Sequence, residues 1–503
     1  MTPSMVFTQN GGTLSLREIP QHAHDRFAQA LLSALSGGWR VVSYFGVPAD
    51  DGVRLYCLLS FKSHATIGVM STLVTGKSFY SLTTEAPQLH LFEREIAEQF
   101  SLEPEGHPWP KPVRFAPALG SLPGVAQHPP PTIGVMDFYR VEGDEVHEVA
   151  VGPVHAGIIE PGHFRFQCFG EEVMHLEVSL GYQHRGVERM MQGRPGERMR
   201  KLAETMAGDT TIGHGTAYAM IVEALASTAP PARAQALRGV ALELERLANH
   251  TGDLGAISGD VGYLPTASFC GRIRGDFLNM TAGICGSRFG RDLVVPGGVA
   301  FDLSGEGARQ LADRIRTARD EVKNAVDLLW DTPSVLARLE GTGVVSEQTA
   351  LELGLVGPAA RASGLNRDIR RDHPFGIYSM SQLPVETGKS GDVYARTMVR
   401  WLEMEKSLDF IEEQLAQLPG GATRRAAGEV SAESLAVALT EGWRGEVCHV
   451  ALTDARGAFS RYKVTDPSFH NWSGLAMALR GGQISDFPLC NKSFNLSYCG
   501  VDL

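Results

Sequence analysis

The chain has 503 residues, of which 43% are hydrophobic and 20% are charged, and its formal net charge is −11. This composition is that of an ordinary globular protein and excludes a disordered or fibrous class, while the length allows two or three domains. The acidic charge is spread along the chain without a long run, which argues against a nucleic-acid-binding surface.

The start of the chain and its cysteines indicate the compartment. The first ten residues lack the basic start and apolar core of a secretory signal, and no run of about 18 apolar residues could span a bilayer. The seven cysteines include no C-x-x-C pair, so we expect reduced thiols. We therefore expect a cytoplasmic protein whose membrane association, if any, is peripheral.

The N-terminal part mixes helical and strand patterns. Apolar residues at helical spacing predict a helix over residues 27–35, and two strands are predicted over residues 39–45 and 53–61. An acidic helix over residues 91–100 closes the unit. The sequence therefore predicts a small α+β domain over residues 1–104.

Prolines dominate the next segment. Nine prolines lie between residues 104 and 131 and interrupt any periodic pattern. We therefore predict an extended, proline-rich linker over residues 105–136, which marks a domain boundary and could lie as a strap over a neighbour.

Residues 137–503 read as a second, mostly helical domain with peripheral strands, so the fold class of the whole chain is α+β. Alternating patterns predict strands at 147–151 and 163–169, and a strand-rich piece at 445–464. Apolar residues three and four apart predict long helices over 198–226, 232–249, 308–329 and 394–418.

Residues 90–108 carry a specific motif, H-L-F-E-R-E-I-A-E-Q-F-S-L-E-P-E-G-H-P. It closely resembles the signature of the C-type subunit of bacterial complex I, H-W-x-E-R-E-x-x-D-x-F-G-I-x-F-x-G-H-P. Glu93, Arg94, Glu95 and the terminal G-H-P coincide. The resemblance implies that residues 1–104 form a domain like this C-type subunit.

Residues 150–503 resemble the D-type subunit of complex I and, more closely, the large subunit of membrane-bound, energy-converting (group 4) [NiFe] hydrogenases. Fusion of the two parts in one chain is also what formate-hydrogenlyase large subunits show. The resemblance rests on six blocks in the family's order: G-P-V-H-A-G-I-I-E-P-G-H-F-R-F (152–166), L-G-Y-Q-H-R-G-V-E-R (180–189), E-L-E-R-L-A-N-H (243–250), P-G-G-V (296–299), G-D-V-Y-A-R (391–396) and E-G-W-R-G-E (441–446).

The metal ligands of this hydrogenase family are missing. The family's C-G-I-C-S-x-x-H corresponds to a stretch within E-T-M-A-G-D-T-T-I-G-H (204–214), which places Ala207 and Thr210 on the cysteine positions. Its S-I-D-P-C-x-x-C-T-D-R corresponds to residues 493–503, which places Ser497 and Gly500 there, with Cys499 one residue out of register. Because nickel and low-spin iron need soft thiolate ligands, we expect no [NiFe] centre.

A quinone site of the complex I type is the alternative at the same place. That family presents a histidine from a T-H-G-V-L-R loop and a tyrosine about fifty residues later. Here Pro161 falls on the histidine position, unless His163 or Glu160 takes over, and Gly208 falls on the tyrosine position. Both contacts of the complex I type are therefore altered.

The resemblance gathers a set of polar residues around this presumed cavity. They could relay protons, or they could form a satisfied structural network, and the sequence leaves both readings open. Arg444 resembles an arginine that faces the metal pocket in the family, and we expect Asp209 or Asp502 as its counter-charge. The candidates are Glu160, His163, Arg165, His184, Asp209, Thr210, His214, Arg444, Ser497, Tyr498 and Asp502.

The resemblance implies a soluble-arm subunit of a membrane-bound, respiratory-type oxidoreductase complex, peripheral on the inner face of the cell membrane. The expected partners are an iron–sulfur small subunit, whose [4Fe-4S] clusters deliver electrons, and antiporter-like membrane subunits. This chain is expected to bind no cofactor of its own, although a quinone is possible, and no nucleic acid. The alternatives are a catalytically silent scaffold and, less favoured, a quinone-reducing subunit or an active hydrogenase.

Overall fold

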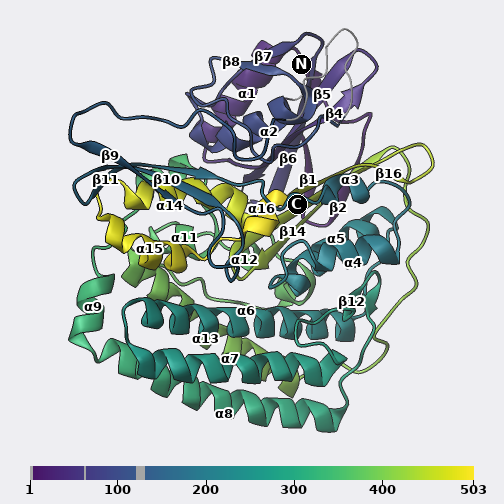
Figure 1. Ribbon diagram of the computed structural model, residues 1–503. Coiled ribbons are helices and arrows are strands. Elements are labelled where there is room, and N and C mark those ends of the chain that lie inside the picture. The colour runs from purple at the N-terminus through teal and green to yellow at the C-terminus, as the bar shows by residue number, and fades with distance from the viewer. Residues whose placement is uncertain (1–3, 62–63, 120–130) are drawn as a thin grey trace.

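The computed structural model describes residues 4–61, 64–119 and 131–503. Helices and strands are mixed along the chain, which confirms the predicted α+β class. The N-terminal part, in purple, lies at one end of the molecule, and a layer of long helices lies at the opposite end (Figure 1). The C-terminal helices, in yellow, lie between these two ends, so the last residues of the chain occupy the middle of the fold.

The N-terminal part is built on a sheet in the order β1-β6-β5-β4, with β3 added to β6 in parallel. Two helices, α1 (His24–Ser36) and α2 (His90–Phe100), bury apolar faces against it. The predicted helices and strands of this part are confirmed, whereas β6 was missed because its buried run mixes apolar residues with Gly, Ser and Thr. The strands are β1 (Val6–Gln9), β3 (Gln21–His22), β4 (Arg40–Ala49), β5 (Gly52–Phe61) and β6 (Thr66–Val74).

The predicted linker lies partly outside the described residues, since 120–130 are not described. A short parallel pair, β7 (Ser78–Tyr80) and β8 (Glu103–Glu105), precedes it, and the described residues between β8 and β9 form no helix or strand. Arg94 of α2 donates to the backbone carbonyls of Lys111 and Pro112, both at 2.7 Å. The start of the linker is thus a strap over the first domain, while the domain boundary itself stays a prediction.

A second sheet, in the order β16-β15-β14-β2, takes its edge strand from the N-terminal part. β2 (Gly12–Ser15) pairs antiparallel with β14 (Ser434–Gly442). A strand near the start of the chain therefore completes a sheet whose other strands come from near its end. The strand-rich piece predicted at 445–464 forms β15 (Gly445–Thr453) and β16 (Phe459–Thr465). A third, antiparallel sheet contains β9 (Val146–Val151), β10 (His163–Phe169) and β11 (Glu172–Ser179), which confirms both strands predicted there.

Four long helices, α6, α7, α8 and α13, pack together (Figure 1). Three of them were predicted, but α6 runs on to Asp260 and α7 was missed, because glycines interrupt its pattern. A glycine of α6 lets α6 and α7 approach closely: a Cβ at Gly255 would lie 2.8 Å from Cβ of Cys270. The helices are α6 (Ala232–Asp260), α7 (Leu264–Cys285), α8 (Gly305–Trp330) and α13 (Val393–Ala416).

The helix predicted over residues 198–226 is wrong as a single element. The structure has α4 (Glu197–Glu204) and α5 (Thr211–Leu225), separated by a loop. The loop is held open by tertiary contacts, because the backbone carbonyl of Asp209 accepts hydrogen bonds from Asn249 and Trp443, both at 2.9 Å. Helical spacing in the sequence does not reveal such contacts.

The remaining elements are short. Among the described residues, no helix is both long enough and apolar enough to cross a bilayer. The short elements are α3 (Val187–Met190), α9 (Pro333–Leu339), α10 (Glu347–Glu352), α11 (Gly357–Ala362), α12 (Ile369–Asp372), α14 (Pro467–Leu479), α15 (Phe487–Phe494), α16 (Tyr498–Asp502), β12 (Val294–Val295) and β13 (Gly298–Val299).

Candidate functional site

Arg444 joins two segments, 204–214 and 493–503, which the sequence analysis aligned with the metal-binding motifs of the hydrogenases. The positions that correspond to the cysteine ligands, Ala207, Thr210, Ser497 and Gly500, are called the emptied positions below. Arg444 lies in the turn between β14 and β15 and forms a two-pronged ion pair with Asp209, with N–O distances of 2.6 and 2.8 Å. Its Nε donates to the carbonyl of Asn495, just before α16. Of the two counter-charges expected from the sequence, Asp209 is therefore the partner, and Asp502 is not.

Arg185 makes a second bridge between the same segments. Its guanidinium donates to the carbonyls of Thr205 and Met206, both at 2.8 Å, and to that of Cys499 at 3.4 Å. The loop between α4 and α5 and the segment leading into α16 are thus brought together, as the resemblance implied.

The four residues predicted to stand at the ligand positions serve packing and helix capping. Ala207 is fully buried, and Thr210 donates to the carboxylate of Asp209 at 3.2 Å. The hydroxyl of Ser497 caps α16 by accepting from the backbone N–H of Gly500 at 2.9 Å. A Cβ at Gly500 would lie 2.6 Å from the carboxylate of Asp466, so that carboxylate stands where a side chain would begin.

This donor set does not fit a nickel–iron centre. A methyl group, two hydroxyls and a glycine supply no thiolate. In residues 4–61, 64–119 and 131–503, no three His, Cys, Asp or Glu side chains gather in a group that could hold a metal ion. No step of the chemistry is therefore assigned to a metal bound by this chain.

Beside the emptied positions runs a fully buried chain of hydrogen bonds. Nε2 of His214 lies 3.2 Å from the carboxylate of Asp466, and its Nδ1 lies 3.0 Å from Nε2 of His449. Nδ1 of His449 in turn lies 2.8 Å from the hydroxyl of Tyr462. The chain connects α5, β15, β16 and the N-terminus of α14, so four elements hold it in place.

The ionisation of Asp466 fixes the donor of one hydrogen bond in this chain. Burial acts to raise the pKa of Asp466, but the hydrogen bond from His214 and the charge of Arg444 outweigh it and hold that pKa below its usual value. Burial keeps the pKa of His449 well below its usual value, so its ring is neutral. An ionised Asp466 only accepts, so Nε2 of His214 donates to it, while the donors of the His214–His449 and His449–Tyr462 bonds are set by the tautomers of the two rings.

A second group of polar side chains lies on the other side of α16 and consists of Asp502, Glu160 and His184. The carboxylate of Asp502 accepts from the backbone N–H groups of Gly181 at 2.7 Å and Gln183 at 3.0 Å, and His184 bonds to its carbonyl at 2.6 Å. Burial raises the pKa of Asp502 to about 6, and Glu160 adds to that rise. Glu160 accepts from Gln183 at 3.1 Å.

Two predicted site residues, His163 and Arg165, face away from the others. Both project from one face of β10 toward Phe138, over whose ring the guanidinium of Arg165 lies at 4.3 Å. Between them Phe164 points to the opposite face, where it contacts the ring of Tyr498. The side-chain period of a strand therefore separates His163 and Arg165 from the C-terminal segment.

Several polar residues of this region were not identified from the sequence. Asp466, His449 and Tyr462 lie on strands or at a helix start, and no motif distinguishes them. Glu245 is buried under the start of α5, where it accepts from the N–H groups of Ile212 and Gly213, and burial raises its pKa to about 8. The only hint in the sequence was that Glu245 lies within the block E-L-E-R-L-A-N-H.

The pocket that Asp209 and Glu245 line is small. Its volume is about 10 Å³, which is enough for about one water molecule and too little for a quinone ring. At Gly208, the position that corresponds to the tyrosine of complex I, a Cβ would meet no atom within 4 Å. Neither headgroup contact of the complex I type is formed by these residues.

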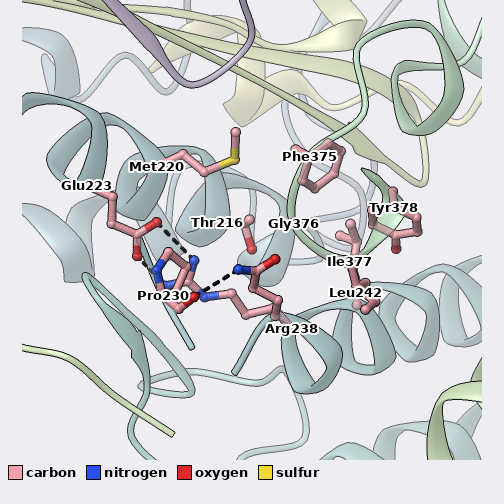
Figure 2. Close-up of a pocket in the computed structure, with 12 residues that line it drawn as sticks. Thr216, Met220, Glu223, Pro230, Arg238, Leu242, Phe375, Gly376, Ile377 and Tyr378 are labelled. Carbon is pink, nitrogen blue, oxygen red and sulfur yellow. Dashed lines mark hydrogen bonds and ion pairs between the residues drawn. The ribbon is translucent and has the colours of Figure 1, made fainter. Parts of the chain in front are cut away.

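A separate pocket of about 130 Å³ lies along another face of α5, against α6 (Figure 2). Figure 2 shows the ion pair of Glu223 and Arg238 at one end, at 2.6 Å, and apolar side chains such as Leu242 and Phe375 at the other. The hydroxyl of Thr216 is buried there without a hydrogen-bond partner. None of the predicted site residues lines this pocket, so it is distinct from the candidate site.

Comparison with known proteins supplies the relatives of the chain. Residues 260–435 match the family model described as "Respiratory-chain NADH dehydrogenase, 49 Kd subunit". Formate hydrogenlyase subunit 5 of Escherichia coli is 31% identical over 436 residues, which cover 84% of this chain and 76% of the relative. The carbon monoxide-induced hydrogenase of Rhodospirillum rubrum is also 31% identical, over 69% of this chain and 97% of the relative.

A solved structure agrees with these matches. It is titled "Structure of the membrane-bound sulfane sulfur reductase (MBS), an archaeal respiratory membrane complex", and one of its chains is 26% identical with a TM-score of 0.67. The match covers 73% of this chain and all of the other. The chain therefore belongs to the family that unites the large subunits of membrane-bound hydrogenases with the 49 kDa subunit of respiratory-chain NADH dehydrogenase.

Proposed function

We propose that this chain is a peripheral arm subunit of a membrane-bound respiratory-type complex, and that its former metal site moves protons. Electrons would arrive on [4Fe-4S] clusters of an iron–sulfur small subunit, and antiporter-like membrane subunits would move the ions. The first domain would take the place of the C-type subunit of complex I. The relatives support the assignment to such complexes, and the site supports a role without a metal.

The chain of hydrogen bonds from Tyr462 to Asp466 carries this proposal. Its members are fully buried and connected end to end beside the emptied ligand positions. Reversal of the donors along such a chain moves one proton from one end to the other without moving a heavy atom far. A redox change in a neighbouring subunit would shift the proton affinity of such a chain, as nearby charges do in general.

Exposed apolar side chains support a partner surface near this site. In the loop between β9 and β10, Val154 is 75% exposed and Ile158 is 86% exposed. The same loop carries Glu160, whose carboxylate accepts from the N–H of Tyr498 at 3.2 Å. Apolar side chains gathered on a surface are typical of contacts with another protein, so the loop would lie against a neighbouring protein of the complex.

The test compares ion transport with assembly in the purified complex. Tyr462→Phe removes the hydroxyl at one end of the chain but keeps the ring, and His214→Gln interrupts its middle. We expect both variants to assemble and to lower ion translocation by about tenfold or more, as loss of a proton-transfer group does. His147→Gln, at an exposed histidine of β9, is the matched control and should change nothing.

Unchanged ion transport in an assembled His214→Gln complex would refute the proton-transfer role. Arg444→Met is the companion variant, because it frees Asp209 and removes the charge that Asp466 senses. If both variants assemble and transport ions like the wild type, the chain is a scaffold instead.

The scaffold is the second candidate, and one observation favours it. Ser497 and Ala207 have become structural, the first as the cap of α16 and the second as a buried methyl group. A scaffold predicts that Ser497→Ala lowers the stability by about 1 kcal/mol without altering electron or ion transfer.

The remaining alternatives find less support in the site. Sulfane sulfur chemistry at Cys499 would need a reactive thiolate, but burial raises the pKa of this thiol to about 12. An active hydrogenase would hold stoichiometric nickel, which metal analysis of the purified complex would reveal. We expect that analysis to find none on this chain, because no thiolates stand at the ligand positions.

A further inference from the structure

A cleft of about 380 Å³ lies where the first domain meets the second, away from the emptied ligand positions. One wall comes from β4 and β5 through Arg40 and Ser60, and another from the segment that runs from α10 to α12. The end of β14 and the start of β15 close it through Glu441 and Glu446.

Ion pairs account for nearly every charge in this cleft. Its carboxylates are bound by arginines inside or behind the walls, and Glu347 is exposed at the rim. His373 bonds through Nε2 to the hydroxyl of Ser60 at 2.7 Å. The pairs are Glu446 with Arg40, Glu441 with Arg361, Asp368 with Arg370, and Asp372 with Arg371.

Arg367 is the exception. Its guanidinium forms no hydrogen bond or ion pair with any residue that the structure describes, and its Nη1 is buried without a partner. Burial, together with the charge of Arg40, lowers the pKa of Arg367 to about 10, but the group remains a cation at neutral pH. Glu446 and Asp372 act on this cation through their charge, but neither bonds to it, so a buried N–H group of Arg367 lacks an acceptor.

We propose that the cleft binds a small oxyanion, a carboxylate or a phosphate, on the guanidinium of Arg367. The planar fork of an arginine matches the geometry of two oxygens of such an anion. The volume is that of roughly a dozen water molecules, so a small oxyanion fits together with part of its hydration shell. A cation is not the expected occupant, because each buried carboxylate of the cleft already binds an arginine, although Oε1 of Glu446 has no hydrogen-bond partner.

The location gives the bound anion a physical connection with the candidate site. The turn from Glu441 to Glu446 separates the two: its ends line the cleft, while Trp443 and Arg444 between them bond to Asp209. The anion would therefore lie behind the turn that holds the loop of the emptied positions. The inference does not depend on proton transfer, because it rests on Arg367 alone.

The experiment uses the full chain and inorganic phosphate as the probe. Calorimetric titration should give saturable binding of one phosphate per chain, and phosphate should raise the midpoint of thermal unfolding more than sodium chloride of equal ionic strength. Acetate tests whether a carboxylate also binds. Arg367→Met should weaken the affinity by about tenfold or more, since a charge-assisted, two-pronged contact is lost.

Arg309→Met is the matched control, because Arg309 is an exposed arginine of α8 and lies outside the cleft. This variant should bind phosphate like the wild type. In phosphate-free buffer, Arg367→Met should unfold at the same midpoint as the wild type or above it, since it removes an unpaired charge.

Two results would overturn the proposal. One is the absence of saturable binding of phosphate or acetate to the wild type, which needs no variant and means that water alone fills the cleft. The other is an equal effect of phosphate on the wild type and on Arg367→Met, which would mean general salt stabilisation. If Arg367→Met does not fold, Arg367→Gln replaces it in the same titration.

Discussion

The two sides of the turn between β14 and β15 are held together in different ways. On the side of the emptied positions, one ion pair, Arg444 with Asp209, is accompanied by contacts to the backbone from Arg185, Ser497 and Asp502. On the opposite side, charges pair with charges from distant parts of the chain: Arg361, with no exposed side-chain surface, binds Glu403 at 2.7 Å and Glu441 at 2.8 Å.

This difference bears on which residues can change alone. A backbone carbonyl or N–H stays in place when a side chain changes, so a residue that bonds only to the backbone can be replaced by itself. A buried carboxylate that loses its arginine is left as an unpaired charge. The buried network of Arg361, Glu403 and Glu441 can therefore change only if several of its residues change together.

The largest expected effect comes from breaking the network. Arg361→Met leaves Glu403 and Glu441 buried with fewer counter-charges, and we expect it to lower the free energy of unfolding by about 3–5 kcal/mol. Arg319→Met is the matched control: Arg319 also binds two carboxylates, those of Asp409 and Glu412, but at the surface. Its loss should cost less than about 1 kcal/mol.

Urea unfolding of the three proteins measures both values. Equal losses for Arg361→Met and Arg319→Met would show that the buried network contributes no more than surface ion pairs, and the contrast between the two sides of the turn would fail.

An intermediate effect is expected at the emptied positions. In Gly500→Ala the new methyl group meets the carboxylate of Asp466, which His214 and the N–H of Ser468 hold in place. Crowding of this kind costs about 1–3 kcal/mol. Gly208→Ala enters open space and should alter the stability by less than about 0.5 kcal/mol.

Thermal unfolding of these two variants decides whether Asp466 fills the former ligand position. If Gly500→Ala is as stable as Gly208→Ala, the carboxylate moves aside easily, and the position remains open to a larger side chain.

The smallest effect is a dependence on pH. Burial raises the pKa of Glu245 to about 8, so the folded chain holds a proton that the unfolded chain releases near pH 4.5. The resulting stabilisation is present at low pH and is lost as the pH rises through 8. Between pH 7 and pH 9 the free energy of unfolding should fall by about 1 kcal/mol more in the wild type than in Glu245→Gln.

The two proteins differ only at residue 245, so the difference between their pH dependences reports on Glu245. Urea unfolding at the two pH values provides the measurement, and parallel slopes for the two proteins would show that Glu245 is ionised throughout.

The sequence predicted helices and strands correctly where the spacing of apolar residues follows the period of the element. The helix at 27–35 and the strands at 53–61 and 163–169 were confirmed because their apolar residues follow the period of the element. The loop between α4 and α5 was missed because contacts from Trp443 and Asn249 open it. Contacts with residues far away in the chain produce no periodic pattern in the local sequence.

The same limit applies to the site. Resemblance brought the segments around Ala207 and Ser497 together, and the expected pairing of Arg444 with Asp209 is confirmed. It could not reveal Asp466, because a carboxylate at the start of a helix reads as an ordinary cap. Nor could it separate His163 from the rest, since the direction of a side chain from β10 depends on the register of the sheet.

The contact between the first domain and β16 has a consequence for exchanging parts between relatives. Glu95, in the E-R-E motif of α2, is fully buried and binds Lys463 of β16 at 2.6 and 2.7 Å. Lys463 also binds Glu188 at 3.0 Å, and Arg114 binds Glu95 from the proline-rich strap. A chimaera that takes its N-terminal part from another protein must therefore carry a matching set at all four positions.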